Sequence, residues 1–338
     1  MIYHISIDLA HSAYKGAIAG DNPQATIVPT PATLEPPAKI HGVRNARETV
    51  VYHSGQYVYL SARGKSPITN AQAFDDNWHS RALLYATLFD LLGEGEHTIN
   101  LIAGIPIAPL MADSARATVR MITRWVEGQH KFSVNGKEAT VIVQKCLIRA
   151  QPTGAFYEYA LDDYGKNRLA DDPNIDRRYA VFDPGANTLD LACIERTGQN
   201  LWPIPTLTGG APLGLSWAAH RLQKLIQSER GREISQVEAD ALLLEFIKRG
   251  AALTKSGIDA TALAQAAIDE WSSEAISFAA RLWGNDHGAA ITLLTGGGAS
   301  LLKKDVLYPG GTVVLSDPIT ANARGLAKYA QREGVWRK

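Results

Sequence analysis

Two aspartates, Asp8 and Asp183, each end an apolar stretch of the sequence, about half a chain apart. In both places a short turn follows, with a tiny residue two positions after the acid and a small polar residue four positions after it. A second apolar stretch then resumes, which is the pattern of a β-hairpin with a carboxylate near its tip. An acid in such a place costs several kcal/mol to desolvate unless it has a partner, so both aspartates are candidates for binding chemistry.

The two copies of the pattern differ seven positions after the acid, where one has Lys15 and the other Asp190. Two such hairpins that face each other can hold a polyphosphate, because backbone N–H groups bind its oxygens and carboxylates hold a hydrated Mg²⁺. Lys15 would then supply a cation for the phosphates and Asp190 a second acid. A solvated strand lysine is the alternative interpretation of Lys15, and it stays open.

A run of three glycines, Gly296, Gly297 and Gly298, follows the apolar stretch 291–295. Glycines after a strand let the backbone approach a flat or charged ligand closely, with a helix N-terminus behind them. A purely structural turn from strand to helix is the alternative.

Composition sets the outer limits. The 338 residues suit two domains, and 46% hydrophobic with 20% charged residues predicts a compact globule. Lysine plus arginine equals aspartate plus glutamate, 34 each, so we expect no direct contact with nucleic acid or an anionic membrane. The two cysteines lie in apolar runs and no stretch is long enough for a membrane helix, which favours a cytoplasmic protein with reduced thiols.

Periodicity predicts the elements that must position these residues. A Pro-rich connection and two alternating strands, 48–52 and 56–60, predict a small surface insertion. Asn135-Gly136 predicts a two-residue type I′ turn between two strands. The polar stretch 162–178 is interpreted as the connection between two halves. Apolar spacing predicts helices over 80–92, 112–126, 216–228, 235–249 and 260–282, and a last helix through Tyr329.

Five segments, in this order, resemble the superfamily of actin, Hsp70 and sugar kinases: 8–15, 151–155, 183–190, 296–300 and the stretch from Asp317. The run 316–325, close to DP-x-x-ANARG, and the run Gln-Pro-x-Gly-Ala at 151–155 are similar to bacterial and archaeal actin-like proteins of the ParM/StbA type. The first loop departs from the family in having Ala10 and His11 where glycine is usual, and the second has Ala186-Asn187 in place of a richer glycine run.

The resemblance implies an α/β, two-lobed actin-like fold in which two RNase H-like domains surround a nucleotide cleft. Residues 1–160 would form domain I, with the small insertion at about 30–80, and residues 179–318 would form domain II. Residues 319–338 would form a C-terminal helix that returns to domain I.

The resemblance also implies roles for single residues. Asp8 and Asp183 would hold Mg²⁺, largely through its waters, and Lys15 would contact the β- and γ-phosphates. Gln151 would position the attacking water, with Asp190 as the alternative, although a simple helix cap is also open for Gln151. Other residues would bind phosphate through backbone or hydroxyl groups: Ser12, Gly185, Asn187 and Thr188. Gly296, Gly297 and Gly298 would lie against the adenosine.

The function implied is a filament-forming, Mg-dependent ATPase that couples phosphoanhydride hydrolysis to polymerisation, with ATP or GTP and Mg²⁺ as cofactors. Such a protein associates with itself and, in plasmid or DNA segregation, with a DNA-binding adaptor; another cytoskeletal role is also compatible. The alternative is a non-polymerising member of the superfamily, such as a metabolite kinase or a nucleotide-regulated scaffold. No clear motif for a catalytic carboxylate lies between the two phosphate loops, which disfavours a kinase.

Overall fold

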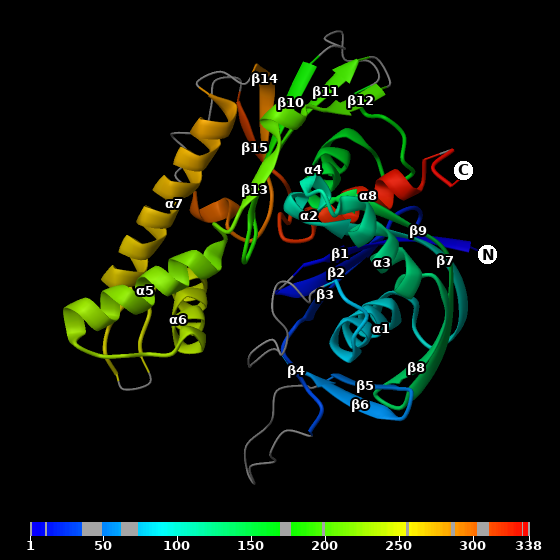
Figure 1. The fold of residues 1–338 in the computed structure, drawn as a ribbon, viewed down its shortest axis with the longest axis horizontal. Helices are drawn as coiled ribbons and strands as arrows, with labels where there is room; N and C mark the ends of the chain where they lie inside the picture. Colours follow the sequence, from blue (N-terminus) through cyan, green and yellow to red (C-terminus); the bar gives the residue numbers. More distant parts are fainter. Residues whose placement is uncertain are drawn as a thin grey trace. The chain divides into compact units, whose positions relative to one another are not determined.

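The computed structural model (Figure 1) describes residues 2–10, 12–35, 49–61, 74–169, 177–197, 200–254, 257–284, 288–302, 311–332 and 334–336. These residues fall into two compact units. Unit 1 comprises Met1–Ile175 and Leu315–Lys338, and unit 2 comprises Asp176–Val314. Each unit is an α/β structure with its own sheet and hydrophobic core.

Unit 1 is built on a nine-stranded sheet with the order β3-β2-β1-β7-β9-β8-β5-β6-β4. Its two parallel pairings, β1 with β7 and β7 with β9, lie at the centre, and the other pairings are antiparallel. The strands are β1 (Ile2–Leu9), β2 (Ala13–Ile18), β3 (Gln24–Pro29), β4 (Ala32–Thr33), β5 (Thr49–His53), β6 (Gln56–Leu60), β7 (Gly95–Ile105), β8 (Gly128–Val134) and β9 (Lys137–Ala150).

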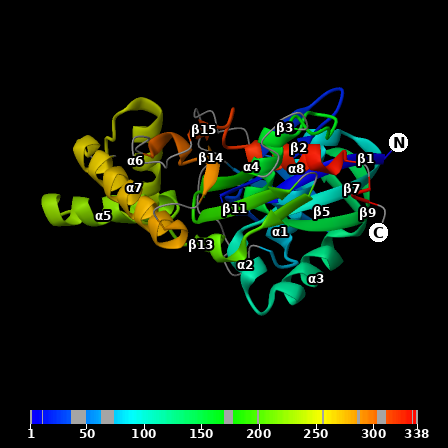
Figure 2. The same cartoon turned by 90° about the horizontal axis from the view of Figure 1, so that it is seen from above.

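Helices cover both faces of this sheet. The sheet curls around α1 (Trp78–Leu92), whose leucines pack in the main core with residues of β5, β6 and β8 (Figure 1). On the other face α4 (Gln151–Ala160) and α8 (Ala321–Ala330) lie side by side, as Figure 2 also shows, and α8 packs on β1, β2 and β7. The ends of β1 and β7 are therefore covered by these two helices.

Local sequence explains several boundaries in unit 1. Asn77 caps α1 by accepting from the Ser80 N–H, and Gly93 ends the helix with a φ of 77°. Asn135 and Gly136 both have positive φ, 51° and 81°, which confirms the predicted turn between β8 and β9.

The helix predicted over 112–126 is present as α3 (Ala115–Val126), which begins three residues later than predicted, and a short helix that was not predicted, α2 (Ile107–Met111), precedes it. Ala112 is extended between them. Pro106 is the N-cap residue of α2, and Asp113 and Ser114 favour a turn over a helix interior, so α3 begins at Ala115.

The two predicted strands at 48–60 appear as the β5–β6 hairpin. These strands extend the main sheet, because β5 pairs with β8 and β6 pairs with β4. Residues 36–48 and 62–73 of the predicted insertion, and residues 170–176 of the predicted connection, lie outside the described residues.

Unit 2 has a six-stranded sheet with the order β12-β11-β10-β14-β15, and β13 pairs with β11. Its strands are β10 (Arg177–Pro184), β11 (Leu189–Thr197), β12 (Asn200–Pro203), β13 (Gly209–Ala211), β14 (Ala289–Leu294) and β15 (Thr312–Val314). Its helices are α5 (Leu215–Arg230), α6 (Gln236–Arg249) and α7 (Thr261–Trp283), with short 3-10 turns at Pro205–Leu207 and Ala299–Leu301. Alanines and leucines of the three helices form the core with β10, β11 and β14.

Both cysteines, Cys146 and Cys193, are buried and unpaired, as predicted. Burial raises the pKa of the Cys193 thiol to about 11. Among the described helices, none has the length and apolar character needed to cross a membrane.

Candidate functional site

The first predicted hairpin is present, and Asp8 lies at its end in direct register with Lys15. β1 is flanked by β2 and β7, so the Asp8 side chain is 1% exposed. Lys15 Nζ lies 3.1 Å from Asp8 Oδ2, and its side chain is 14% exposed. The local hairpin therefore supplies the counter-charge of the buried acid, while the lysine keeps partial access to solvent.

Gln151 reaches the same carboxylate from a distant part of the chain. It is the first residue of α4, and its Nε2 donates a hydrogen bond to Asp8 Oδ1. Gly104 of β7 leaves the room for this approach, because a Cβ there would lie 3.5 Å from Gln151 Cγ and 2.9 Å from Leu326 Cδ1. The side chain of Gln151 is thus directed at the acid, and it makes no cap on its own helix.

The turn of the first hairpin is tied to the rest of unit 1 by its backbone. The Ser12 carbonyl accepts hydrogen bonds of 3.2 Å from both the N–H and the hydroxyl of Thr30. His79 Nε2 lies 2.5 Å from the Thr30 carbonyl, so it carries the proton, and burial lowers the pKa of His79. The Ser12 side chain is exposed, and His11 lies outside the described residues. A phosphate contact of Ser12 stays a prediction.

In unit 2, Asp183 and Asp190 face each other directly across the β10–β11 ladder. They are only 5% and 2% exposed. The Thr188 hydroxyl donates to Asp190 Oδ2 at 3.1 Å, and a Cβ on Gly210 of β13 would lie 2.5 Å from Asp190 Oδ1. Like charges directly opposite each other in a sheet repel and destabilise it. A cation bound near Asp183 and Asp190 would offset this repulsion.

The loop between these two acids is held against the start of α5. Gly185 N–H donates to the Thr188 carbonyl at 2.8 Å, which closes the loop on itself. Two N–H groups of the first turn of α5 then donate to loop carbonyls, Leu215 to Gly185 at 3.1 Å and Ser216 to Ala186 at 2.7 Å. These donors of α5 are therefore used inside the protein.

Asn187, predicted to bind phosphate, is half-buried, and its carbonyl accepts from the Gly214 N–H at 3.3 Å. The hydroxyl hydrogen of Thr188 points to Asp190, while its oxygen keeps lone pairs that can accept. Phosphate binding by Gly185, Asn187 and Thr188 stays a prediction.

The three glycines after β14 lie beside the same loop. Gly296 has a φ of +80°, and a Cβ there would lie 2.6 Å from the Pro184 carbonyl oxygen. Gly298 donates its N–H to that carbonyl at 2.9 Å, and a Cβ on Gly298 would lie 2.8 Å from Trp271 Cη2. Gly297 is exposed. A 3-10 turn, Ala299–Leu301, follows these glycines directly, and residues 303–310 behind it lie outside the described residues.

Sequence reasoning missed the residues that support this loop, namely Gly210, Gly214 and Trp271. A sequence signal was available for two of them, because the run Gly209-Gly210-Ala211-Pro212-Leu213-Gly214 is rich in glycine, which is typical of a close backbone approach. Trp271 Nε1 donates to the Leu213 carbonyl at 2.8 Å, and no sequence pattern marked that tryptophan.

The chemical groups at these positions are of the kinds that bind a magnesium-bound nucleotide. Unit 1 offers a buried carboxylate, a partly accessible ammonium group and an amide, and unit 2 offers two buried carboxylates beside glycine backbone. Within the described part of the chain, no group of three or more His, Cys, Asp or Glu side chains is arranged as a metal site. Mg²⁺ keeps several waters and needs only one or two carboxylates when phosphates complete its shell, so this arrangement is compatible with it.

Known proteins share this architecture. The structure superposes on the ParM subunit of a 15-stranded filament from Clostridium botulinum with a TM-score of 0.77 and 17% identity, over 98% of this chain and 99% of that one. It superposes on Ta0583, an archaeal actin homolog, with a TM-score of 0.75 and 16% identity, over 98% and 100% of the two chains. The chain has the actin-like fold.

The resemblance seen in the sequence, to actin-like proteins of the ParM type, is thereby confirmed at the level of the fold. The ADP complex of Ta0583 matches with a TM-score of 0.71 and 16% identity, over 98% of this chain and 100% of that one. Residues 181–307 also match the family described as "Archaeal actin homologue MreB-like, C-terminal". No protein of curated function matches the sequence.

Proposed function

We propose that this actin-like chain is a Mg²⁺-dependent ATPase that assembles into filaments in a nucleotide-dependent manner. The observation that carries the proposal is the buried Asp8 carboxylate, held between the Lys15 ammonium and the Gln151 amide. This arrangement has the three components that phosphoanhydride hydrolysis requires: an acid for a metal, a cation for phosphate oxygens and an amide that can orient water.

Each residue has a separate task in this proposal. Asp8 and Asp183 would hold Mg²⁺, largely through its waters, and bound Mg²⁺ would supply charge neutralisation for the phosphates. Lys15, whose side chain is partly exposed beside Asp8, would contact the β- and γ-phosphates. Gln151 orients the attacking water, and Asp190 is the second candidate for that task. Gly296, Gly297 and Gly298 would lie against the adenosine.

The comparisons support self-association, because one matching structure is a ParM filament. They support a bound nucleotide, because another matching structure is an ADP complex. A nucleotide that binds two conformations with different affinity can switch assembly on and off. In this proposal the filament acts in the cytoplasm, in plasmid or DNA segregation or another cytoskeletal role, and a DNA-binding adaptor links it to its cargo.

Sedimentation and light scattering with ATP, GTP, ADP and a non-hydrolysable analogue test the proposal, together with phosphate release. We expect ATP or the analogue to give a pellet, and Mg²⁺ to be required for phosphate release. The variant Asp183→Ala should lose Mg-ATP turnover. Failure of calorimetry to detect any binding of Mg-nucleotide to the purified chain would reject the proposal. Binding with turnover but no pellet would reject the filament and leave a non-polymerising nucleotide-dependent protein.

A further inference from the structure

Three residues of α4 share the face that meets α8. Gln151, Gly154 and Glu158 follow the spacing i, i+3 and i+7, which places them along one side of a helix. A Cβ on Gly154 would lie 2.8 Å from the Asn322 carbonyl carbon, and a Cβ on Gly325 would lie 2.8 Å from the Gly154 carbonyl carbon. The two helices therefore meet backbone to backbone, with no side chains interlocked at their closest point.

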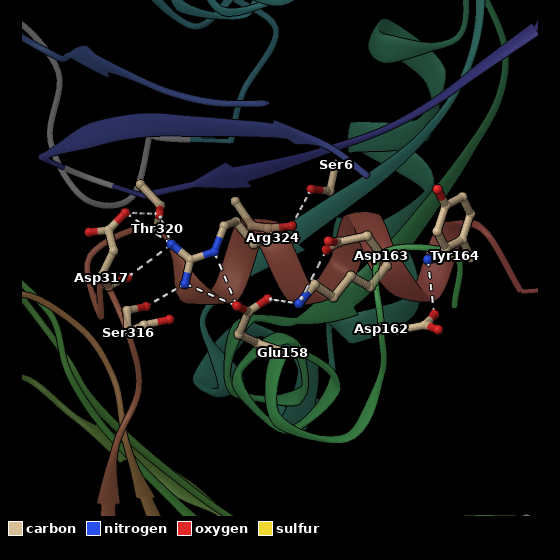
Figure 3. Close-up of polar contacts among 11 residues, drawn as sticks. Ser6, Glu158, Asp162, Asp163, Tyr164, Ser316, Asp317, Thr320 and Arg324 are labelled. Carbon is tan, nitrogen blue, oxygen red and sulfur yellow. Dashed lines mark hydrogen bonds and ion pairs between the residues drawn. The ribbon is translucent and has the colours of Figure 1, made fainter. Parts of the chain in front are cut away.

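At one end of this contact the Glu158 carboxylate lies between two cations of α8 (Figure 3). Arg324 donates to Glu158 Oε1 from Nε at 3.2 Å and from Nη2 at 3.1 Å. Lys328 Nζ lies 3.0 Å from Glu158 Oε2. Glu158 is 9% exposed and Lys328 is 5% exposed, so the ion pairs are largely desolvated and their geometry is tightly defined.

The other side of the Arg324 guanidinium holds the segment that enters α8. Its Nη1 lies 3.0 Å from Asp317 Oδ2 and 2.7 Å from Thr320 Oγ1, and its Nη2 donates to the Ser316 carbonyl. Asp317 has a positive φ of 42°, a conformation that needs such support in a residue other than glycine. Ser6 of β1 donates to the Ala323 carbonyl, so α8 is also anchored to the strand that ends in Asp8.

We propose that Glu158, gripped by Arg324 and Lys328, is a positioning residue for Gln151. The glycines let α4 and α8 approach backbone to backbone, and the rings of Tyr157 on α4 and Tyr329 on α8 stack with their centroids 4.4 Å apart. The ion pairs at Glu158 add the directional contacts that set the axial position of α4 on α8. Gln151 lies seven residues earlier, about 10 Å along the same helix, so this position decides where its amide meets Asp8.

This inference rests on the proposed function for its kinetic test alone. The variant Glu158→Gln keeps the size of the side chain and removes its charge. We expect its kcat for ATP hydrolysis to fall about tenfold with KM changed less than twofold, because a small misplacement of a positioned group impairs the reaction more than binding. The matched control is Glu245→Gln, which breaks the exposed pair of Glu245 with Arg249 on α6 and should leave kcat unchanged.

A double-variant cycle separates positioning from a general structural effect. In a Gln151→Ala background, Glu158→Gln should cause no further loss of kcat. A second tenfold loss in that background would overturn the proposal, because Glu158 would then act without Gln151. Lys328→Arg keeps a cation at Glu158 and should retain wild-type kcat.

A spectroscopic test needs no nucleotide. The side-chain amide resonances of Gln151, identified by their loss in Gln151→Ala, should move in Glu158→Gln toward those of solvent-exposed glutamines. Unchanged resonances in a folded Glu158→Gln variant would overturn the inference. If Glu158→Gln does not fold, the Gln151 amide resonances should move in the same direction in Lys328→Met, by a smaller change in chemical shift. A wild-type protein without hydrolysis would reject the proposed function, and the resonances would still decide the positioning role.

Discussion

Replacement of Lys15 by methionine tests the buried ion pair at the end of β1 most directly. Methionine keeps much of the length and apolar surface of the lysine stem, so the main change is the loss of the ammonium group. Asp8 is 1% exposed, and its Oδ2 would lose the contact that the ammonium makes at 3.1 Å. Removal of one partner of a fully buried pair costs about 3–5 kcal/mol. Because the Lys15 side chain is 14% exposed and water can reach the pair, we expect Lys15→Met to lower the opening free energy of unit 1 by about 3 kcal/mol, the lower end of this range.

The matched control is Lys137→Met. Lys137 Nζ lies 3.9 Å from Glu94 Oε1 in the same unit, but the two side chains are 62% and 66% exposed. An exposed pair contributes about 0–1 kcal/mol, so this variant should be close to the wild type. The double variant Asp8→Asn/Lys15→Met removes both charges and leaves an oxygen to accept from Gln151. It should recover about 2 kcal/mol relative to Lys15→Met alone, because no charge stays buried without its partner.

Hydrogen–deuterium exchange on peptides from β1, β2 and α4 measures the opening free energy of unit 1 by itself, which global unfolding of a two-unit chain does not. Equal effects of Lys15→Met and Lys137→Met would refute the argument that Asp8 depends on Lys15. The argument would also be refuted if the double variant Asp8→Asn/Lys15→Met lost as much opening free energy as the single variants Asp8→Asn and Lys15→Met lose together.

Three further outcomes follow from the structure. The variant Gln151→Ala should keep nucleotide binding and slow hydrolysis by roughly 10²-fold in phosphate-release assays; normal hydrolysis would remove that residue from the mechanism. Burial lowers the pKa of both His79 and His130, so below about pH 6.5 the unfolded chain takes up protons that the folded chain does not. Stability in urea melts should therefore fall with decreasing pH, by up to about 1.4 kcal/mol per pH unit for each histidine, and less steeply in a His130→Phe variant. Gly325→Ala should lower the unfolding free energy by about 1–3 kcal/mol despite the better helix propensity of alanine, because its Cβ would press on Gly154; a stabilised variant in thermal melts would contradict the close contact of α4 and α8.

The hairpins could be predicted from the sequence because their signals are local. Strand alternation and the turn residues lie within ten or so positions of one another, and the direct pairing of Asp8 with Lys15 follows once the register is known. The short helix α2 was not predicted because its five residues are too few to show the apolar spacing of a helix, and the turn preference of Asp113 and Ser114 explains why α3 begins only at Ala115.

Contacts between distant segments could not be predicted in the same way. Gln151 donates to Asp8 across 143 positions of the chain, and Arg324 reaches Glu158 across 166. Nothing in the sequence near Glu158 shows that two cations of α8 will meet it, because that depends on how closely the glycines let α4 and α8 approach. Family resemblance supplied Gln151 as a candidate, whereas the ion pairs that hold its helix required the structure.

The three glycines after β14 show how protein packing and ligand binding can be told apart. Gly296 requires glycine for its positive φ and its closeness to Pro184, and Gly298 requires it because Trp271 fills the space of a Cβ. For Gly297 the nearest atom to a Cβ would be Leu215 Cδ1 at 4.0 Å, and the residue is exposed, so the protein itself has room for a side chain there. Gly297→Ala should therefore leave thermal stability unchanged and weaken nucleotide binding in calorimetry if adenosine lies on this backbone. Unchanged affinity in that variant would assign the glycine run to the turn alone.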